Sequence, residues 1–284
     1  MRDYTISIVI PSLGGNLCDT LDSINEGSVR PDEIVICLPN NTHSVKHANK
    51  YKNLVIKYAQ KYGQVYQRII GFKNAKGGYV LQMDDDIILE KNCLENLLIC
   101  LMKLGNTAAI APAYFKRNTN SSLYKKKSKS LFHRAVYWVA NGSLGYEPGV
   151  ISLSGINFGL NFSNKTQDFN ESEWLPGGCI MHFRENLIMK DYFPFNGKAY
   201  SEDLIHSFLL KERGLKLYIC NDSVVYTDVV STESVKEIYK QYIISKYVNS
   251  VYGIGLTRLK AYYLIKLIFF LFKKGKKFTK RIVI

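Results

Sequence analysis

The chain has 284 residues, of which 46% are hydrophobic and 22% charged. That apolar share can bury a core, which excludes a disordered or fibrous chain, and the length fits one large α/β domain or two small ones. The net charge of +14 is unevenly distributed: no acid follows Glu237, whereas 11 of the 38 basic residues lie from Lys240 to Arg281. The remaining 27 basic groups face 24 acids, so the body is nearly neutral and the tail strongly cationic.

The cysteines and the N-terminal residues indicate in which cellular compartment the protein is expected. Six cysteines are scattered without a CxxC pair, and no histidine lies at metal-ligand spacing. A disulfide scaffold or a zinc ribbon is therefore disfavoured and a reducing compartment is expected. The first apolar run, Ile6–Ile10, is too short for the hydrophobic region of a signal peptide. We therefore expect a cytoplasmic protein.

Short apolar runs alternate with helix-like stretches in the first third of the chain. They predict buried strands over Thr5–Ile10, Glu33–Leu38, Leu54–Tyr58 and Tyr79–Met83. Helices are predicted over Leu17–Glu26, Gln64–Lys76 and Leu89–Leu104. This alternation favours a mostly parallel sheet covered on both faces, whose ligands bind at the carboxyl ends of the strands. Two such ends carry unusual residues, Pro11–Gly15 and Asp84–Asp86.

The second half is less regular. The lysine-rich stretch Asn118–Arg134 is expected to be a solvated loop or insertion, in preference to a binding element. Elements are predicted again after Trp174: a strand over Cys179–Phe183, a helix over Ser201–Gly214, and late strands over Leu217–Cys220 and Val224–Tyr226.

Three consecutive aspartates, Asp84–Asp86, end an apolar strand. Like charges side by side are costly unless something offsets them, and a divalent cation is the obvious partner because Mg²⁺ and Mn²⁺ prefer oxygen ligands. Strand geometry sends Asp84 and Asp86 to one side and Asp85 to the other. Because Mg²⁺ usually keeps phosphate oxygens in its shell, a diphosphate is the expected ligand. The alternative is a polar turn that caps the next helix, and the triplet alone does not decide between the two.

Several motifs around the triplet occur in a fixed order. Ile10–Pro11 ends the first strand, a Leu-x-x-x-Leu-x-Ser-Ile helix follows from Leu17, and Pro31–Ile36 reads Pro-Asp-Glu-Ile-Val-Ile. An Arg-x-x-Gly-x-x-x-Ala-x-Gly-x-Tyr series from Arg68 then leads into the triplet, and Trp174–Arg184, Ser201–Leu204 and Gly214–Leu217 continue the order. Over residues 5–230 the chain resembles the family 2, GT-A type glycosyltransferases.

The resemblance implies a Rossmann-like GT-A fold and sugar transfer from a nucleoside diphosphate sugar to a glycan or lipid-linked acceptor, with inversion and with Mn²⁺ or Mg²⁺. It implies a general base at Asp203 and donor binding by Pro11, Ser12, Arg68, Asp84 and Asp85. Acceptor contacts are expected from Trp174, Gly177, Gly178 and Glu202. Asp84, Asp86 and Asp228 are the expected metal ligands.

Two positions depart from the family pattern. The base-binding acid expected after the second strand is replaced by Cys37–Asn41, and Asp228 stands where a histidine near the metal is common.

Each candidate residue also has a structural reading. Ser201 could cap a helix that holds Glu202 and Asp203 in its first turn, where acids favour the helix dipole. Arg68 could pair with the diphosphate, pair with Asp85, or lie on the surface. Trp174 could stack on a sugar or pack in the interior, and Gly177–Gly178 could form only a tight turn. His133, His182 and His206 are expected to be structural.

The tail combines aromatic, aliphatic and basic residues. Its apolar run Leu267–Phe272 is too short to span a bilayer, which takes about 20 apolar residues. An amphipathic helix on an anionic membrane surface is expected instead, in preference to nucleic-acid binding or a core or dimer helix.

We therefore expect a transferase domain over residues 1–230, with a donor half (1–115) and an acceptor half (170–230), followed by a membrane-associating tail (231–284). The protein would be peripheral on the inner face of the cell membrane. Competing hypotheses are a sugar-phosphate nucleotidylyltransferase, which fits poorly because Pro11–Gly15 has no nearby basic residue, and a catalytically degenerate nucleotide-sugar-binding protein or membrane scaffold.

Overall fold

The computed structural model describes residues 4–124, 131–160, 168–195, 199–228 and 234–282, with side chains described up to residue 272. Compact packing divides the chain into two units. The first contains residues 1–125 and 160–229, and the second contains residues 126–159 and 230–284. The domain expected over residues 1–230 therefore needs a correction, because residues 126–159 group with the C-terminal helices.

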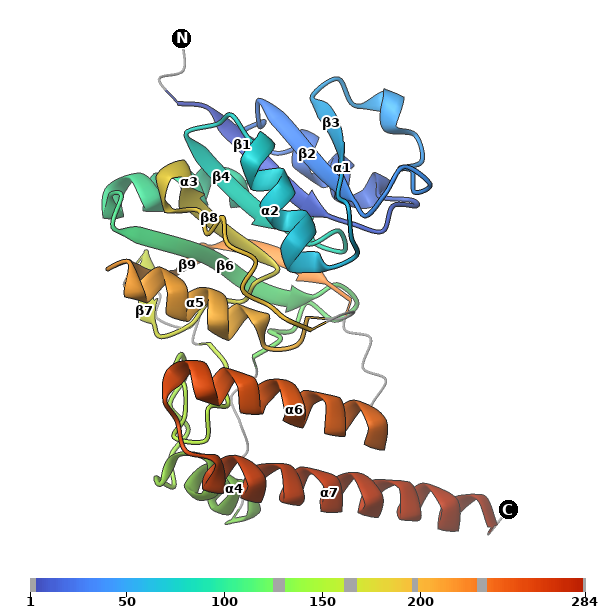
Figure 1. Ribbon diagram of the computed structural model, residues 1–284, viewed down its shortest axis with the longest axis vertical. Helices are drawn as coiled ribbons and strands as arrows, with labels where there is room; N and C mark the ends of the chain where they lie inside the picture. The colour runs from blue at the N-terminus through green and yellow to red at the C-terminus, as the bar shows by residue number, and fades with distance from the viewer. Residues whose placement is uncertain (1–3, 125–130, 161–167, 196–198, 229–233, 283–284) are drawn as a thin grey trace. The chain divides into compact units, whose positions relative to one another are not determined.

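The first unit is built on a mixed sheet with strand order β3-β2-β1-β4-β8-β6-β9-β5 (Figure 1). Its parallel part comprises β1 (Ile6–Pro11), β2 (Glu33–Leu38), β3 (Leu54–Tyr58) and β4 (Tyr79–Met83). The antiparallel strand β8 (Cys179–Phe183) joins β4 to β6 (Ala108–Lys116). Beyond β6 lie β9 (Lys216–Thr227) and, antiparallel to it, β5 (Ile88–Leu89) and β7 (Phe169–Ser172).

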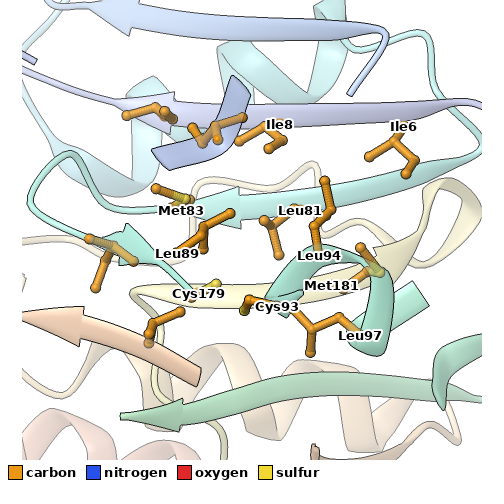
Figure 2. Packing of buried hydrophobic residues seen from close by; sticks show 14 of the residues in the cluster. Ile6, Ile8, Leu81, Met83, Leu89, Cys93, Leu94, Leu97, Cys179 and Met181 are labelled. Atoms are coloured by element: carbon orange, nitrogen blue, oxygen red, sulfur yellow. The ribbon is translucent and has the colours of Figure 1, made fainter. Parts of the chain in front are cut away.

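The helices of this unit are α1 (Cys18–Asn25), α2 (Gln64–Asn74), α3 (Cys93–Leu104) and α5 (Glu202–Glu212), with short 3₁₀ turns at Ala48–Lys50 and Arg184–Asn186. Alternate strand residues point to opposite faces of the sheet. Ile6, Ile8 and Ile10 therefore enter one core, whereas Val9 packs with Phe72 of α2 in a separate cluster on the other face. Figure 2 shows the first core, in which Leu94 and Leu97 of α3 belong to the same cluster as buried side chains of β1, β4 and β8.

The early strands agree with expectation to within one residue, but three segments differ. The helix expected from Leu89 begins at Cys93, because Ile88–Leu89 pair with β9. The two late strands are one strand, β9, whose pairing with β6 shifts register between Pro112 and Ala113. Part of the expected loop Asn118–Arg134 is helical, because α4 begins at Leu131, and residues 125–130 lie outside the described part.

The second unit consists of α4 (Leu131–Asn141), α6 (Val235–Tyr252) and α7 (Leu256–Ile282). Leu259, Tyr263 and Phe270 of α7 pack against Ile238 of α6. Arg258 of α7 donates to the Trp138 and Val139 carbonyls of α4, at 2.8 and 3.1 Å. These contacts explain why α4 groups with the C-terminal helices. No helix in the described residues is both long and apolar enough to cross a bilayer.

Candidate active site

A cavity of about 490 Å³ opens at the carboxyl ends of β1 and β4 and the start of α2. Parallel neighbouring strands bring their ends to one edge of the sheet, which is the usual ligand position in such folds. Both unusual strand ends from the sequence, Pro11–Leu13 and Asp84–Asp86, line it. Tyr62, Gly63, Gln64 and Gln67 complete the lining.

The three aspartates have different surroundings. The Asp84 carboxylate accepts a hydrogen bond from Gln64 Nε2 at 2.7 Å, and the same oxygen lies 3.5 Å from Arg68 Nη2. Asp85 instead accepts from the Ser12 hydroxyl at 2.5 Å. Asp86 is exposed at the cavity wall. Asp84 and Asp85 thus have different partners, but strand alternation is not the reason, because β4 ends at Met83 and Asp85–Asp86 form a turn.

Arg68 is buried, with 2% of its side chain exposed, and joins two carboxylates that are far apart in sequence. Its Nη1 donates to Glu202 Oε1 at 2.8 Å, while Nη2 faces Asp84. The other Glu202 oxygen accepts from the Tyr192 hydroxyl at 2.8 Å. The expected pairing with Asp85 and the surface reading of Arg68 are therefore wrong. The guanidinium is thus engaged inside the protein, and the expected contact of Arg68 with the diphosphate stays a prediction.

Gly177 and Gly178 bring the two carboxylate groups together. A Cβ on Gly177 would lie 2.5 Å from Glu202 Oε1 and 3.3 Å from the Asp203 Cβ. A Cβ on the adjacent Gly178 would lie 3.1 Å from Asp84 Oδ2. These glycines have ordinary backbone conformations, so close approach and not a left-handed turn explains them. Asp84 and Asp203 therefore meet the same dipeptide.

Asp203 lies in the first turn of α5, where its Oδ1 accepts from the Leu204 amide at 3.0 Å. Burial and the neighbouring Glu202 raise the pKa of Asp203 to about 7. Burial also raises the pKa of Asp84, to about 6, against the lowering effect of Arg68. Ser201 occupies the N-cap position, but its side chain makes no capping hydrogen bond and its φ is 51°. The capping role expected for Ser201 is therefore wrong, and a strained residue precedes the two acids.

Replacing Gly177 with alanine should impair this arrangement. The added methyl group would overlap Glu202 and push it from Arg68, so we expect a loss of about 1–3 kcal/mol in unfolding free energy together with reduced activity. Gly78→Ala is the matched control, because a Cβ there meets only Thr5 Oγ1 at 3.9 Å. Chemical denaturation measures both. Equal stability of the two variants would contradict the close approach.

The expected metal ligands are only partly gathered. Within the described ranges, no group of three His, Cys, Asp or Glu side chains is placed to hold a metal ion. Asp84 already pairs with Gln64 and Arg68. Asp86 and Asp228, however, each lie two residues beyond the paired residues Ile88 and Tyr226, at the same end of the β5–β9 ladder. Since Mg²⁺ often takes only one or two protein carboxylates beside phosphate oxygens, the residues present fit such an ion.

Two aromatic predictions have different outcomes. Trp174 is 1% exposed and meets Tyr124 edge to face, with ring centroids 5.9 Å apart, so the expected stacking on an acceptor sugar is wrong and Trp174 is a core residue. His182 and His206 are buried with rings 5.4 Å apart. Burial lowers the pKa of both, to about 3 for His206, which fits the structural role expected for them.

The sequence analysis missed Gln64, Gln67 and Tyr192. Gln64 and Arg68 lie one turn apart on α2 and both reach Asp84, and Gln67 donates to the Ser12 and Cys37 carbonyls at 2.8 and 2.7 Å. Gln64, Gln67 and Arg68 are three and four residues apart on one predicted helix, so the sequence already indicated that they share a face. Tyr192 stands in no motif, and its contact with Glu202 was not readable from the sequence.

Residues 7–179, more than half of the chain, match the family model described as Glycosyl transferase family 2. The chain belongs to this family. No curated protein sequence matches this glycosyltransferase.

Solved structures share its fold. A crystal structure of GalNAc-T7 with UDP, GalNAc and Mn²⁺ is 17% identical, with a TM-score of 0.60 over 91% of this chain and 54% of that one. A structure of S. aureus TarS 1-349 in complex with UDP-GlcNAc is 16% identical, with a TM-score of 0.54 over 87% of this chain and 66% of that one. The glycosyltransferase thus spans about half of the first protein and about two thirds of the second. The expected fold class, a mostly parallel α/β sheet of GT-A type, is confirmed.

Proposed function

We propose that this glycosyltransferase moves a sugar from a nucleoside diphosphate sugar to an acceptor hydroxyl, with inversion at the anomeric carbon. The observation that supports it best is the convergence of Asp203 and Asp84 on Gly177–Gly178, beside a cavity with an acidic wall. A base and a diphosphate site must face the same sugar from opposite sides for inverting transfer.

In this proposal Asp203 removes the acceptor proton. The acceptor oxygen forms the bond to the anomeric carbon, the bond from that carbon to the diphosphate oxygen breaks, and the electron pair leaves with the diphosphate. A carboxylate with a pKa near 7 is well matched to proton transfer at neutral pH. Arg68 and Tyr192 hold Glu202, and Glu202 with Gly177 orients the acceptor side.

The proposed donor site is the cavity at the ends of β1 and β4. Ser12 and Asp85, already joined by a hydrogen bond, lie there with Pro11 and offer groups for ribose or sugar hydroxyls. Asp84, Asp86 and Asp228 would hold Mn²⁺ or Mg²⁺, which would neutralise charge on the leaving diphosphate. UDP-sugars are the first donors to test, since GalNAc-T7 and TarS were solved with UDP and UDP-GlcNAc.

The test is a screen of nucleotide sugars with Mn²⁺. The correct donor should raise the melting temperature by mass action and yield free nucleoside diphosphate on turnover. Donor binding without product, with any glycan or lipid-linked acceptor, would favour the competing proposal of a degenerate nucleotide-sugar-binding protein.

Replacing Asp86 with alanine should weaken Mn²⁺ binding. Loss of a ligand should raise the Mn²⁺ concentration for half-maximal turnover at least about tenfold, and a chelator should abolish wild-type turnover. The exposed Asp222, in β9 away from the cavity lining, provides the control variant Asp222→Ala. Turnover that survives both the chelator and Asp86→Ala would contradict a metal-dependent reaction.

We further propose that the enzyme works on the inner face of the cell membrane as a peripheral protein. The six cysteines are all free thiols in the structure, as a reducing compartment favours. A lipid-linked or growing glycan acceptor would then be within reach. Localisation of a tagged full-length chain by fractionation tests this proposal, and recovery in the soluble fraction alone would contradict it.

A further inference from the structure

The second unit exposes large apolar side chains that its own packing does not use. On α7, Leu264, Ile268, Leu271 and Phe272 are exposed and follow an i, i+4, i+7, i+8 spacing, which places them on one face of the helix. Leu259, Tyr263 and Phe270 are buried and pack with α6. The α7 helix therefore has two apolar faces, and only one of them is covered.

The uncovered face continues onto α4, which is distant in sequence. Leu131 is 81% exposed on α4, and Phe132 and Trp138 are also exposed. The Phe132 ring lies 4.3 Å from the ring of Phe269 on α7, and the Arg258 guanidinium sits 5.9 Å from the Trp138 ring. The exposed residues of α4 and α7 thus share one unit and meet through these contacts. Isolated exposed apolar residues are ordinary, but such a cluster marks an interaction surface.

Charge decides what kind of partner fits. The α7 segment Leu256–Ile282 contains nine basic and no acidic residues, and α4 adds Arg134 without an acid. A second copy of the same face would bring like charges together, which opposes self-association. An anionic bilayer satisfies both features, because acyl chains accept the apolar side chains and headgroups attract the lysines and arginines. Exposed Trp and Phe suit the interfacial region.

We propose that α4 and α7 together form a membrane-docking face that inserts shallowly into an anionic leaflet. The new element is α4: the docking face is not confined to the C-terminal tail but includes Leu131, Phe132 and Trp138 from the middle of the chain. This proposal rests on the proposed peripheral membrane location but not on the sugar-transfer reaction.

The test is co-sedimentation of the full chain with vesicles of equal parts phosphatidylcholine and phosphatidylglycerol, and with phosphatidylcholine vesicles alone. Binding should require the anionic lipid. Leu131→Ser/Trp138→Ser on α4 and Leu264→Ser/Leu271→Ser on α7 should each weaken partitioning about tenfold. The matched control is Ile99→Ser/Met102→Ser, which makes the same kind of change at exposed positions of α3 in the first unit. Melting curves check that each variant is folded.

Three results would overturn the proposal. Full binding by the α4 variant would confine docking to the tail. Salt-sensitive binding that ignores both apolar variants would reduce it to surface charge alone. A concentration-dependent dimer that the same variants abolish, without vesicle binding, would assign the face to a second copy of the chain.

Discussion

Replacing Asp203 with asparagine should lower the rate of sugar transfer by about 10²–10⁴-fold, the range for loss of a general base. Donor binding should persist, because Asp203 lies outside the cavity lined by Asp84–Asp86. The measurements are kcat and KM with the identified donor and acceptor, beside the melting temperature.

The raised pKa of Asp203 gives this prediction a pH profile and a stability control. Since the ionised form is the active base, wild-type kcat/KM should rise with pH through about 7 and then level off. A carboxyl whose pKa is raised by folding stabilises the protein at low pH and loses that contribution as pH rises through the folded pKa. Asparagine removes a desolvated charge, so the variant should not melt earlier at pH 8. Asp191→Asn, at an exposed pair with Lys61, is the control. A variant of Asp203 that stays within a few-fold of wild type would end its role as the base.

Replacing Arg68 with methionine should be the most destabilising change near the site. It leaves Glu202, with a side chain only 6% exposed, and the nearby Asp84 without their shared counter-charge. Breaking a buried pair from one side costs about 3–5 kcal/mol, which urea denaturation would measure. Turnover should fall too, because Glu202 and Asp203 are adjacent at the start of α5.

Two further variants make the Arg68 prediction specific. Arg117→Met breaks the exposed pair with Asp19 and should leave the free energy of unfolding close to that of the wild type. Arg68→Met/Glu202→Gln removes both charges of the buried pair and should recover part of the lost stability, since the Tyr192 hydroxyl can still donate to the amide oxygen of the new side chain. A single Arg68 variant as stable as the Arg117 variant would show that the buried pair contributes little.

The sequence predicted those parts of the fold where local pattern and tertiary structure agree. The early strands are short β-branched runs that are buried in a parallel sheet, and their bounds were readable. β6 was not expected, because Pro112 interrupts an alanine-rich run and proline argues against a central strand. In the structure the pairing with β9 shifts register at that proline. α4 was hidden behind the lysine-rich stretch before it, and its apolar residues became meaningful only beside α7.

In the candidate site, too, the sequence indicated individual residues but not their contacts with distant parts of the chain. Motif order led to Asp84–Asp86, Gly177–Gly178 and Asp203, and the structure places Asp84 and Asp203 against the Gly177–Gly178 dipeptide. The partners of these residues were not readable, because the ion pair between Arg68 and Glu202 depends on how α2 and α5 are placed beside each other in the fold. The sugar contact expected for Trp174 was wrong because an indole beside a glycine turn suggests a ligand. Its burial depends on contacts with Tyr124 from another segment, which the sequence does not show.

The second unit is built from two segments that are separated in the sequence by part of the first unit. Residues 126–159 emerge from the ribosome before the remaining strands of the sheet, yet their helical partners lie in residues 230–284, which follow those strands. Tyr137 and Ala140 can already pack with Phe158, but the side of α4 that meets Arg258 and Phe269 has no cover until α7 has been synthesised. During that interval α4 is a natural point of contact for a chaperone or a lipid surface, and nascent chains halted before residue 230 should be prone to aggregate.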